Sequence, residues 1–326
     1  MKGLQVVARG RAEYIDMPQP RVLDGHVLVR PRYLSLCGSD IQMLHYARDR
    51  QYPFPPGTTG HEMVGFVEDI AVGTVDTDGH ALERGDRVLA LAPTHQAMCQ
   101  LFLAPCHHVL KLPNDVPMLH LLQGQQYGTV IYACQRLRDV IAKSVAIIGQ
   151  GSAGLWFAFQ VRRMGARRVV VLDLDERRLL LSRHFGATDL VQNVDVDVLQ
   201  AVCDANGGEL PDIVIEAAGE IESINLAPRL VKKFGQVLYF GYPRSQEFTF
   251  NYDELFHKCC HATTIVGAAE ESRQVSTRIA INTIASGAID VSPMLTHTFP
   301  FREVHDAYEA HRTHADGAVK IVVEME

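Results

Sequence analysis

The sequence feature that most constrains the fold is the glycine motif Gly149-Gln-Gly151-Ser-Ala-Gly154. It directly follows the apolar run SVAII and opens a helical pattern rich in apolar residues. In such a strand-turn-helix unit the first glycine permits a tight turn, the second lets the backbone approach a pyrophosphate, and the third lets helix and strand pack closely. The N-terminus of the helix then faces the phosphates. The motif predicts a dinucleotide site with contacts from Gly149, Gly151, Ser152, Ala153 and Gly154.

A carboxylate follows where the ribose of a dinucleotide is expected. Asp173 ends the apolar run VVVLD, and its oxygens can accept hydrogen bonds from both hydroxyls of the adenosine ribose. The same charge repels a 2′-phosphate; Asp175 and Glu176 add to that repulsion, whereas Arg177 and Arg178 weaken it. The sequence therefore predicts NAD rather than NADP as cofactor, with Asp173 and Arg178 among its contacts. In the competing interpretation the glycines only form a turn and Asp173 only caps the next helix.

Alternating apolar and amphipathic runs extend from about Gly124 to Gly267. A helical stretch, TVIYACQRLRDV, leads into SVAIIG, and the strands VVVLD, DIVIE, QVLYF and TTIV follow with helical patterns between them. This βαβα order predicts an α/β fold with a doubly wound parallel sheet covered by helices on both faces. Because strand ends in such a sheet point at the ligand crevice, Ala218, Gly241, Gly267 and Ala268 are predicted to contact the cofactor. In the competing interpretation each of these small residues only turns the chain.

The chain before this α/β region has a different texture. Short β-rich runs such as HVLVRPRYLSL, HEMVGFVEDI and GDRVLAL are punctuated by glycine and proline, which predicts an irregular, mostly β domain. After Gly267 come a helix, the segment FPFREVHDAYEAHRTH and a last strand, AVKIVVEM, too few elements to bury their own apolar faces. We therefore predict a catalytic domain of residues 1–123 and 268–326 and a dinucleotide domain of residues 124–267.

Charge, apolar runs and cysteine spacing indicate which partners and which location to expect. The formal net charge of -7 comes with no basic stripe, so no nucleic-acid partner is expected. The N-terminal run MKGLQVVARG lacks the features of a secretory signal, and no apolar stretch is long enough to span a bilayer, so no membrane association and a cytoplasmic location are expected. The 7 cysteines have no regular spacing, which indicates reduced thiols.

Two short motifs in the first domain complete a recognisable set. Cys37-Gly-Ser39-Asp40 is followed by Gly60-His61-Glu62, then by Gly-Asp-Arg-Val and the glycine-rich nucleotide region. This combination resembles the zinc-type medium-chain dehydrogenase/reductases, particularly their polyol and threonine dehydrogenase branch, over essentially the whole chain. The resemblance implies a GroES-like, mostly β catalytic domain joined to a Rossmann nucleotide domain. It also implies a homodimer or homotetramer.

The resemblance implies a catalytic metal site in the first domain. Cys37 and His61 would ligate zinc, Ser39 would accept the proton of a substrate hydroxyl into a relay, and Asp40 would hold a zinc ligand. Zinc binds thiolate and imidazole, keeps a position open, and lowers the pKa of an alcohol so that the alkoxide can expel hydride. A neighbouring hydroxyl can pass the proton to solvent. In the competing interpretation Cys37 is a small buried apolar residue and His61 a hydrogen-bonded turn residue.

The third metal ligand is where the sequence departs from its relatives. The polyol branch has Glu-Pro-Leu before the helix that links the domains, whereas this chain has Gln125-Gln126-Tyr127. Three outcomes remain open: Gln125 ligates weakly, Glu62 becomes the third protein ligand, or the metal is lost. The four-cysteine lobe of many relatives is missing too, because Cys99 has no partner in a C-x-x-C pair, so one catalytic zinc and no structural zinc are expected. His95 receives no role.

The resulting prediction is an oxidoreductase acting on a small-molecule alcohol. It would oxidise a secondary alcohol, polyol or amino-alcohol to a carbonyl with NAD, or catalyse the reverse, with catalytic zinc and the Ser39 relay. Two alternatives stay open: a zinc-free NAD(P)H-dependent reductase of the same superfamily, favoured by Gln125, and a non-catalytic NAD-binding protein. The substrate itself depends on pocket shape, which the sequence does not fix.

Overall fold

The computed structural model describes residues 1–325 and groups them into two units. Unit 1 consists of Met1–Thr129 and the chain from Ala268 onward, and unit 2 is Val130–Gly267. The division falls inside helix α3 (Gly124–Cys134), a few residues beyond the boundary drawn from the sequence. Helix α3 also ends earlier than expected. Asp139 accepts a hydrogen bond from the backbone N–H of Ile141, a local turn that competes with continued helix.

Unit 1 is built on a seven-stranded sheet with the order β14-β15-β3-β4-β5-β7, in which β6 also pairs with β3. Strands β14 and β15 are parallel and the other pairs antiparallel. A separate antiparallel pair is formed by β1 and β2. The strands are β1 (Lys2–Ala8), β2 (Arg11–Asp16), β3 (His26–Ser35), β4 (Glu62–Ile70), β5 (Arg87–Leu91), β6 (Phe102–Pro105), β7 (Val109–Lys111), β14 (Leu295–Pro300) and β15 (Lys320–Glu324).

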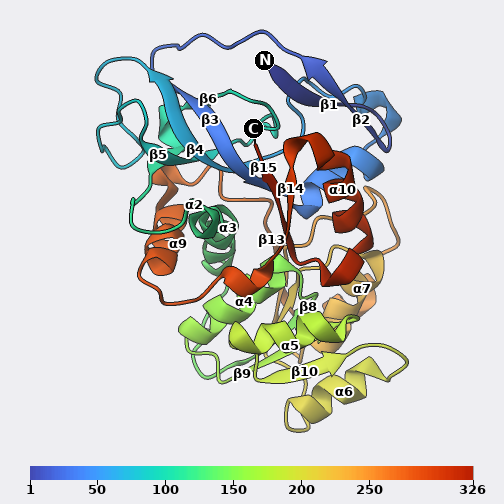
Figure 1. Ribbon diagram of the computed structural model, residues 1–326. Helices are drawn as coiled ribbons and strands as arrows, with labels where there is room; N and C mark the ends of the chain where they lie inside the picture. Colours follow the sequence, from blue (N-terminus) through green and yellow to red (C-terminus); the bar gives the residue numbers. More distant parts are fainter. Residues whose placement is uncertain (326) are drawn as a thin grey trace. The chain divides into compact units, whose positions relative to one another are not determined.

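The core of unit 1 follows from the alternation of side chains along its strands. Val27 and Val29 of β3 and Ile321 and Val323 of β15 are all fully buried in one apolar cluster. Figure 1 shows β15, in red, beside the blue strand β3, although nearly 300 residues separate them in the sequence. The last strand is therefore part of the same core as the first.

The helices of unit 1 are short. They are α1 (Gly38–Ile41), α2 (Met118–Leu121), the first part of α3, α9 (Val275–Ala285) and α10 (Val304–Thr313). Helix α10 packs against β14 and β15 and buries Tyr308. In the part of the chain that the structure describes, no helix has the length and apolar character needed to cross a membrane.

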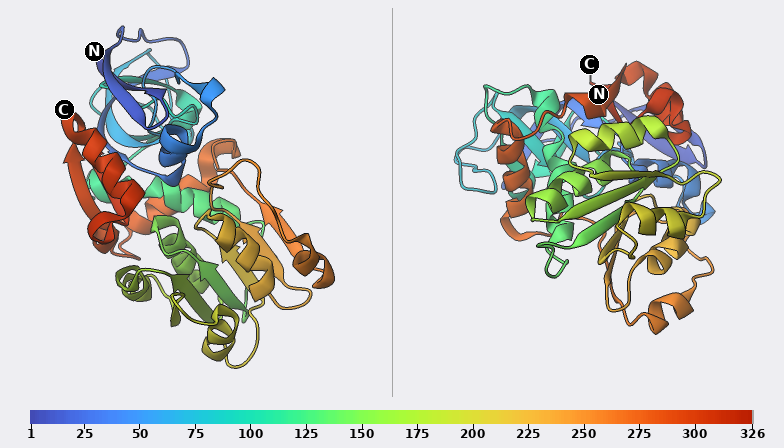
Figure 2. Two further views of the ribbon diagram at one scale, coloured as in Figure 1. Left: turned by 90° about the vertical axis from the view of Figure 1, so that its right-hand side faces the viewer. Right: turned by 90° about the horizontal axis from the view of Figure 1, so that it is seen from below.

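Unit 2 is a six-stranded parallel sheet with the order β10-β9-β8-β11-β12-β13. This is the strand order of a doubly wound dinucleotide-binding fold. Helices lie on both sides of the sheet (Figures 1 and 2). The predicted fold class is thus confirmed. The strands are β8 (Ser144–Ile148), β9 (Arg168–Asp173), β10 (Asp189–Gln192), β11 (Ile213–Glu216), β12 (Gln236–Tyr239) and β13 (His261–Thr264), and the helices are α4 (Ser152–Arg163), α5 (Glu176–His184), α6 (Val198–Ala205), α7 (Ile221–Leu230) and α8 (Tyr252–His257).

The central strands of unit 2 are apolar on both faces, as a sheet between two helical layers requires. All residues of β8 and β11 are buried, and so are Val169 to Leu172 of β9. The edge strand β13 instead alternates between half-buried and exposed residues. Continuous apolar runs in the sequence therefore mark the centre of the sheet, and strand β8, which leads into the glycine motif, lies in that centre.

Candidate active site

The pairing register of β3 and β4 brings the two motifs of unit 1 together. Ser35 pairs with Glu62, so Cys37, just beyond the end of β3, and His61, just before β4, lie at the same end of the strand pair. One ligand atom each from Cys37, His61 and Glu62 lie within 4.8 Å of one another. Residues far apart in the sequence thus form one cluster because of antiparallel pairing.

Asp40 joins the two loops of this cluster. Its Oδ2 accepts a hydrogen bond of 2.9 Å from the N–H of Cys37, and its Oδ1 accepts one of 3.0 Å from the N–H of Gly60. Oδ1 also lies 3.8 Å from Nδ1 of His61. Burial alone would raise the pKa of Asp40, but the neighbouring rings of His61 and His95 outweigh burial and lower it well below its usual range. Asp40 is therefore a buried anion that holds the cluster in place.

Gly60 is required by the shape of this loop. Its φ of +90° lies in the left-handed region that favours glycine, and a Cβ atom there would lie 2.7 Å from Cδ2 of Leu34. The residue before His61 therefore has to be glycine for the imidazole to reach its place beside Asp40.

His61 lies between an acid and a thiol. Burial would lower its pKa, but the nearby Asp40 carboxylate and Cys37 sulfur raise it well above the usual value. The site thus favours a positive charge at this position. A metal cation would take the place of that proton, because ligands bind metals in their deprotonated forms.

The two carboxylate oxygens of Glu62 have different surroundings. Oε2 accepts a short hydrogen bond from the hydroxyl of Ser35 and lies 2.5 Å from Nζ of Lys320. Oε1 is buried, has no hydrogen-bond partner, and lies 3.9 Å from Nε2 of His61. One oxygen is therefore anchored and the other is free to accept a cation.

The residues present fit a zinc ion. Thiolate, imidazole and carboxylate are all zinc ligands, and three protein ligands leave the fourth position of a catalytic site open. The unpartnered Oε1 of Glu62 is available as the carboxylate ligand. Ser39, in α1, has a buried hydroxyl without a hydrogen-bond partner, as expected of a group that awaits a substrate. Gln125 lies in α3, where its backbone carbonyl accepts a hydrogen bond from the hydroxyl of Thr129.

The cluster of Cys37, His61 and Glu62 is assembled without Gln125, whose role as a ligand stays a prediction. Two other residues near the cluster received no role from the sequence. Lys320 could have been suspected as the only charge inside the apolar run AVKIVV, whereas nothing in the local sequence marks His95.

Cys99 lies outside this cluster and behaves as a packing residue. Its buried Sγ donates a hydrogen bond of 3.1 Å to the carbonyl of Leu101, and burial raises the pKa of the thiol to about 12. A neutral thiol of this kind is a poor metal ligand, since metals bind the thiolate.

The three motif glycines of unit 2 have three distinct environments. Gly149 has φ +92°, and a Cβ there would meet the Cβ of Ala218 at 2.9 Å. A Cβ on Gly154 would lie 1.9 Å from the carbonyl oxygen of Gly149, so this glycine allows α4 to pack against β8. A Cβ on Gly151 would meet nothing within 4 Å. The open surface at Gly151, directly before Ser152 and Ala153 of α4, fits a phosphate group at the helix N-terminus.

Asp173 lies at the end of β9 beside the glycine loop. Its Oδ2 accepts a hydrogen bond of 2.6 Å from the N–H of Gln150, and its Oδ1 accepts one of 2.9 Å from the N–H of Asp175. The cap of helix α5 is Asp175, which accepts from the N–H of Arg177 at 2.8 Å. The interpretation of Asp173 as the helix cap is therefore wrong. Arg178 is buried on α5.

A third buried carboxylate organises the loops that follow β11 and β12. Oε1 of Glu216 accepts hydrogen bonds from the N–H groups of Ala218 and Gly219 and from the hydroxyl of Ser223, at 2.9, 2.8 and 2.7 Å. A Cβ on Gly241 would lie 2.2 Å from the nitrogen of Gly219 and 2.6 Å from Oε2 of Glu216. Gly241 thus lies against Gly219, the residue after Ala218, and Glu216, to which the sequence assigned no role, holds both loops.

Gly267 and Ala268 fall on either side of the division between the units. A Cβ on Gly267 would meet nothing within 4 Å, while Ala268 is buried. Their contact with a cofactor stays a prediction.

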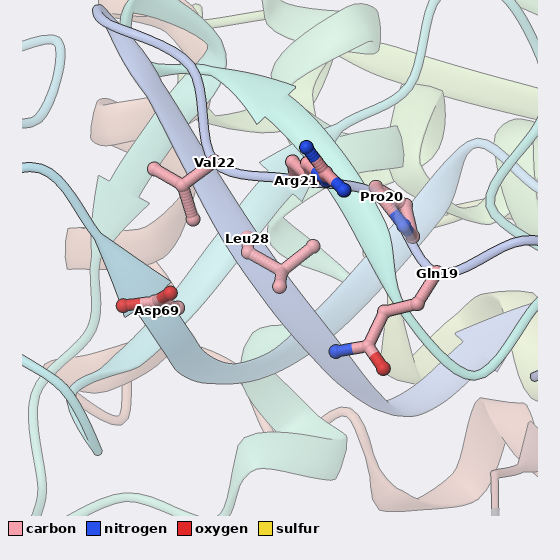
Figure 3. Close-up of a pocket in the computed structure, with 6 residues that line it drawn as sticks. All are labelled: Gln19, Pro20, Arg21, Val22, Leu28 and Asp69. Atoms are coloured by element: carbon pink, nitrogen blue, oxygen red, sulfur yellow. The ribbon is translucent and has the colours of Figure 1, made fainter.

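A pocket of about 380 Å³ lies elsewhere in unit 1. Figure 3 shows the loop from Gln19 to Val22 beside Leu28 of β3 and Asp69 of β4. Arg21 and Asp69 are its charged lining residues, and it shares no residue with the cluster of Cys37, His61 and Glu62. We assign it no catalytic role.

Comparison with known families agrees with this arrangement of fold and site. Residues 23–114 match the alcohol dehydrogenase GroES-like domain, and residues 154–281 match the family described as zinc-binding dehydrogenase. The chain belongs to the zinc-type medium-chain dehydrogenase/reductase family, and the predicted pairing of a GroES-like domain with a Rossmann domain is confirmed.

Curated relatives cover nearly all of the chain, and solved structures cover the whole of it. The L-threonine 3-dehydrogenase of Shewanella woodyi is 24% identical over 327 residues, covering 94% of each chain. The alcohol dehydrogenase TADH from Thermus sp. ATN1 has a TM-score of 0.82 at 21% identity and covers 100% of both chains. The apo form of zinc dependent alcohol dehydrogenase 2 from Streptococcus pneumonia has a TM-score of 0.84 at 23% identity, covering 100% of this chain and 99% of that one. The solved structures support the fold, and the family supports an oxidoreductase.

Proposed function

We propose that this protein oxidises an alcohol to a carbonyl compound, or catalyses the reverse reaction, with NAD and one catalytic zinc. The observation that carries the proposal is the cluster of Cys37, His61 and Glu62 within 4.8 Å, with the unpartnered Oε1 of Glu62 inside it. The partnerless hydroxyl of Ser39 lies two residues from Cys37. A half-buried thiol, a half-buried imidazole and a buried carboxylate facing one another serve no evident purpose in packing alone.

Cys37, His61 and Glu62 would hold the zinc. When bound, zinc supplies a Lewis acid that lowers the pKa of an alcohol, and NAD supplies the hydride acceptor. Nδ1 of His61 lies on the side of Asp40, 3.8 Å from its Oδ1, and Nε2 is turned toward Glu62, 3.9 Å from its Oε1. This arrangement favours Glu62 over Gln125 as the third protein ligand.

Ser39 would move the substrate proton. Its hydroxyl can accept a hydrogen bond from an alcohol and donate its own proton onward, which makes it both acceptor and donor in a relay. Because the hydroxyl has no partner among the described residues, no existing hydrogen bond has to be broken for this role.

In unit 2, Gly151 and Asp173 would bind the dinucleotide. The open surface at Gly151 accommodates the pyrophosphate, and the Asp173 carboxylate, already oriented by Gln150 and Asp175, accepts hydrogen bonds from the ribose. Its charge supports NAD over NADP, because a 2′-phosphate would be repelled.

The substrate class is an alcohol carrying hydrogen on the carbinol carbon, with secondary alcohols, polyols and amino-alcohols as the first candidates. The names of the relatives, an L-threonine 3-dehydrogenase and two alcohol dehydrogenases, support this range. A screen of NAD reduction should therefore include L-threonine, sugar alcohols and short secondary alcohols.

The experiment that tests the proposal compares two cysteine variants. Cys37→Ser should lose the zinc of the catalytic cluster and turnover while NAD affinity stays within about twofold, whereas Cys106→Ser, a change at a half-buried free thiol, should retain that zinc, turnover and NAD affinity. Zinc content is measured on purified protein, NAD affinity by calorimetry, and turnover on the alcohol screen. Equal loss of metal and NAD affinity in Cys37→Ser would mean that Cys37 is structural.

Two other results would select the remaining alternatives. Full activity of metal-free wild-type protein would indicate a zinc-free reductase. NAD binding without turnover of any alcohol, in protein that retains zinc, would favour a non-catalytic role.

A further inference from the structure

The loop after β5 brings another histidine to the cluster. Glu62 pairs with Leu91 across β4 and β5, so the residues after Leu91 lie beside those before Glu62. The N–H of Ala97 donates to the carbonyl of Gly60 at 3.2 Å, and the N–H of His95 closes a turn on the carbonyl of Ala92 at 2.8 Å. The short loop thereby delivers His95 to the side of His61, with ring centroids 4.2 Å apart.

One ligand atom each from Asp40, His61 and His95 lie within 4.8 Å of one another. Nδ1 of His95 lies 3.7 Å from Oδ1 of Asp40, and Nδ1 of His61 lies 3.8 Å from the same oxygen. Both Nδ1 atoms are buried and neither has a hydrogen-bond partner. Hydrogen bonds between nitrogen and oxygen are about 2.7–3.2 Å long, so these three groups are too far apart to satisfy one another.

The separations suit a cation between the three groups. Nitrogen and oxygen ligands lie about 2.0–2.2 Å from zinc, which places neighbouring ligands of a tetrahedral ion about 3.3–3.6 Å apart. The two spacings to Oδ1 of Asp40 exceed this by a few tenths of an ångström, a shift that side-chain rotation supplies. Oδ1 of Asp40 accepts one hydrogen bond, from Gly60, and keeps a second lone pair for a cation.

We propose that Asp40, His61 and His95 form a second divalent-cation site, which shares the imidazole of His61 with the site formed by Cys37, His61 and Glu62. The two ring nitrogens of His61 face opposite partners: Nδ1 faces Asp40, and Nε2 faces Glu62. Two imidazoles and one carboxylate suit borderline ions such as Zn²⁺, Co²⁺, Ni²⁺ and Fe²⁺ rather than Ca²⁺ or Mg²⁺. When both sites are filled, the ring of His61 carries no proton.

The second site would tie two loops together. A cation there connects the loop that carries His95 to the loop of Gly60 and His61, and it fixes the orientation of the shared ring. The inference rests on the proposed function only through the shared ligand His61.

Cobalt titration of metal-stripped full-length protein distinguishes the two sites. Thiolate-to-cobalt charge transfer gives a near-ultraviolet absorption that only the site with Cys37 can produce. Wild-type protein should bind two equivalents of Co²⁺ per chain, one of them with this absorption. His95→Ala and His95→Gln should retain the absorption and lose the second equivalent, with its affinity reduced at least tenfold. Cys37→Ser should retain the equivalent that lacks the absorption.

His107→Ala, a change at an exposed histidine of the same unit, should bind both equivalents and serves as the control. One equivalent in wild type, with the thiolate absorption and with unchanged affinity in both His95 variants, would overturn the second site and leave the proposed catalytic zinc intact. One equivalent without that absorption, lost in the His95 variants, would instead overturn the proposed thiolate site and support this inference. Near-ultraviolet circular dichroism before titration confirms that each variant is folded.

Discussion

Nζ of Lys320 lies 2.5 Å from Oε2 of Glu62, and the two side chains are 0% and 1% exposed. Both residues reach this position from strands that flank β3, since Val322 of β15 and Glu62 of β4 pair with the same residue, Ser35. The Lys320 ammonium group therefore balances the charge of Glu62 at close range, although the two groups are not aligned for a hydrogen bond. A carboxylate at this depth needs such a partner, because an uncompensated buried charge costs several kcal/mol.

Removing this counter-charge should destabilise the fold. In metal-stripped protein, Lys320→Met keeps most of the side-chain volume but leaves Glu62 buried without a cation, so we expect a loss of about 3–5 kcal/mol in the free energy of unfolding. The measurement is equilibrium denaturation in urea. Lys2→Met is the matched control, because Lys2 pairs with Asp16 on the surface, where ion pairs contribute about 0–1 kcal/mol. Similar losses in the two variants would show that the buried pair has no special role.

Sequence motifs could identify the parts of the site that are local. Spacing and the neighbouring apolar strands are enough to identify the glycine loop, Asp173 and the residues around Cys37 and His61. Lys320, His95 and Glu216 could not be found in this way, because their roles depend on which strands pair and in which register. Parallel and antiparallel pairings between distant segments leave no trace in local periodicity.

Two glycines of the same motif should respond differently to alanine. At Gly151 the backbone is extended, with φ −67° and ψ −178°, and a Cβ would meet nothing, so Gly151→Ala should leave stability unchanged or raise it by about 0.4–1 kcal/mol. The methyl group would, however, occupy the surface that a pyrophosphate approaches, and NAD affinity should fall at least tenfold. Denaturation and calorimetric titration measure the two quantities on one preparation.

Gly154→Ala should chiefly lower the stability of the fold, in contrast to Gly151→Ala, which should chiefly lower NAD affinity. Its Cβ would lie 1.9 Å from the carbonyl oxygen of Gly149, so helix α4 must shift away from β8. We expect a loss of about 1–3 kcal/mol in unfolding free energy, as for other overpacked positions. If Gly151→Ala proved the less stable of the two, or bound NAD normally, the assignment of the open surface to the pyrophosphate would be wrong.

Ser39→Ala should impair turnover without disturbing metal or cofactor. The buried hydroxyl has no hydrogen-bond partner, so its removal breaks no existing contact, and stability should change little. If the hydroxyl relays the substrate proton, kcat should fall by about 10²- to 10⁴-fold while zinc content and NAD affinity stay unchanged. Ser35→Ala is not equivalent, since Ser35 binds Glu62; a suitable control is Ser292→Ala on the surface. Unchanged kcat in Ser39→Ala would exclude the relay.

Asp173→Asn should weaken NAD binding and relax the discrimination against NADP. Asparagine keeps an acceptor for the N–H of Gln150 but loses the charge that binds the ribose and repels a 2′-phosphate. We expect NAD affinity to fall about tenfold or more and the ratio of NADP to NAD affinity to rise. Asp197→Asn, at the cap of α6 in the same unit, should change neither. An unaltered cofactor preference would show that another group selects between the two nucleotides.

Glu216 should make stability depend on pH. Burial raises its pKa above the usual 4.5, and the hydrogen bonds from Ser223, Gly219 and Ala218 only partly oppose this. Since the folded state favours the protonated acid, this contribution to stability is fully present below the ordinary pKa and is lost as pH rises through the raised value. Glu216→Gln keeps the shape without the ionisation. Its unfolding free energy should therefore improve relative to wild type as pH rises from about 4.5 to 7.5, by about 1.4 kcal/mol for each unit of pKa shift.

Urea denaturation at three pH values in this range measures the difference between the two proteins. Glu209→Gln, a change at an exposed glutamate of unit 2, should follow wild type at every pH. A constant difference between Glu216→Gln and wild type would mean that Glu216 ionises normally in the folded protein, despite its burial. In that case the hydrogen bonds to the loop of Ala218 and Gly219 would be strong enough to stabilise the full charge, and the same variant should then weaken NAD binding by loosening that loop.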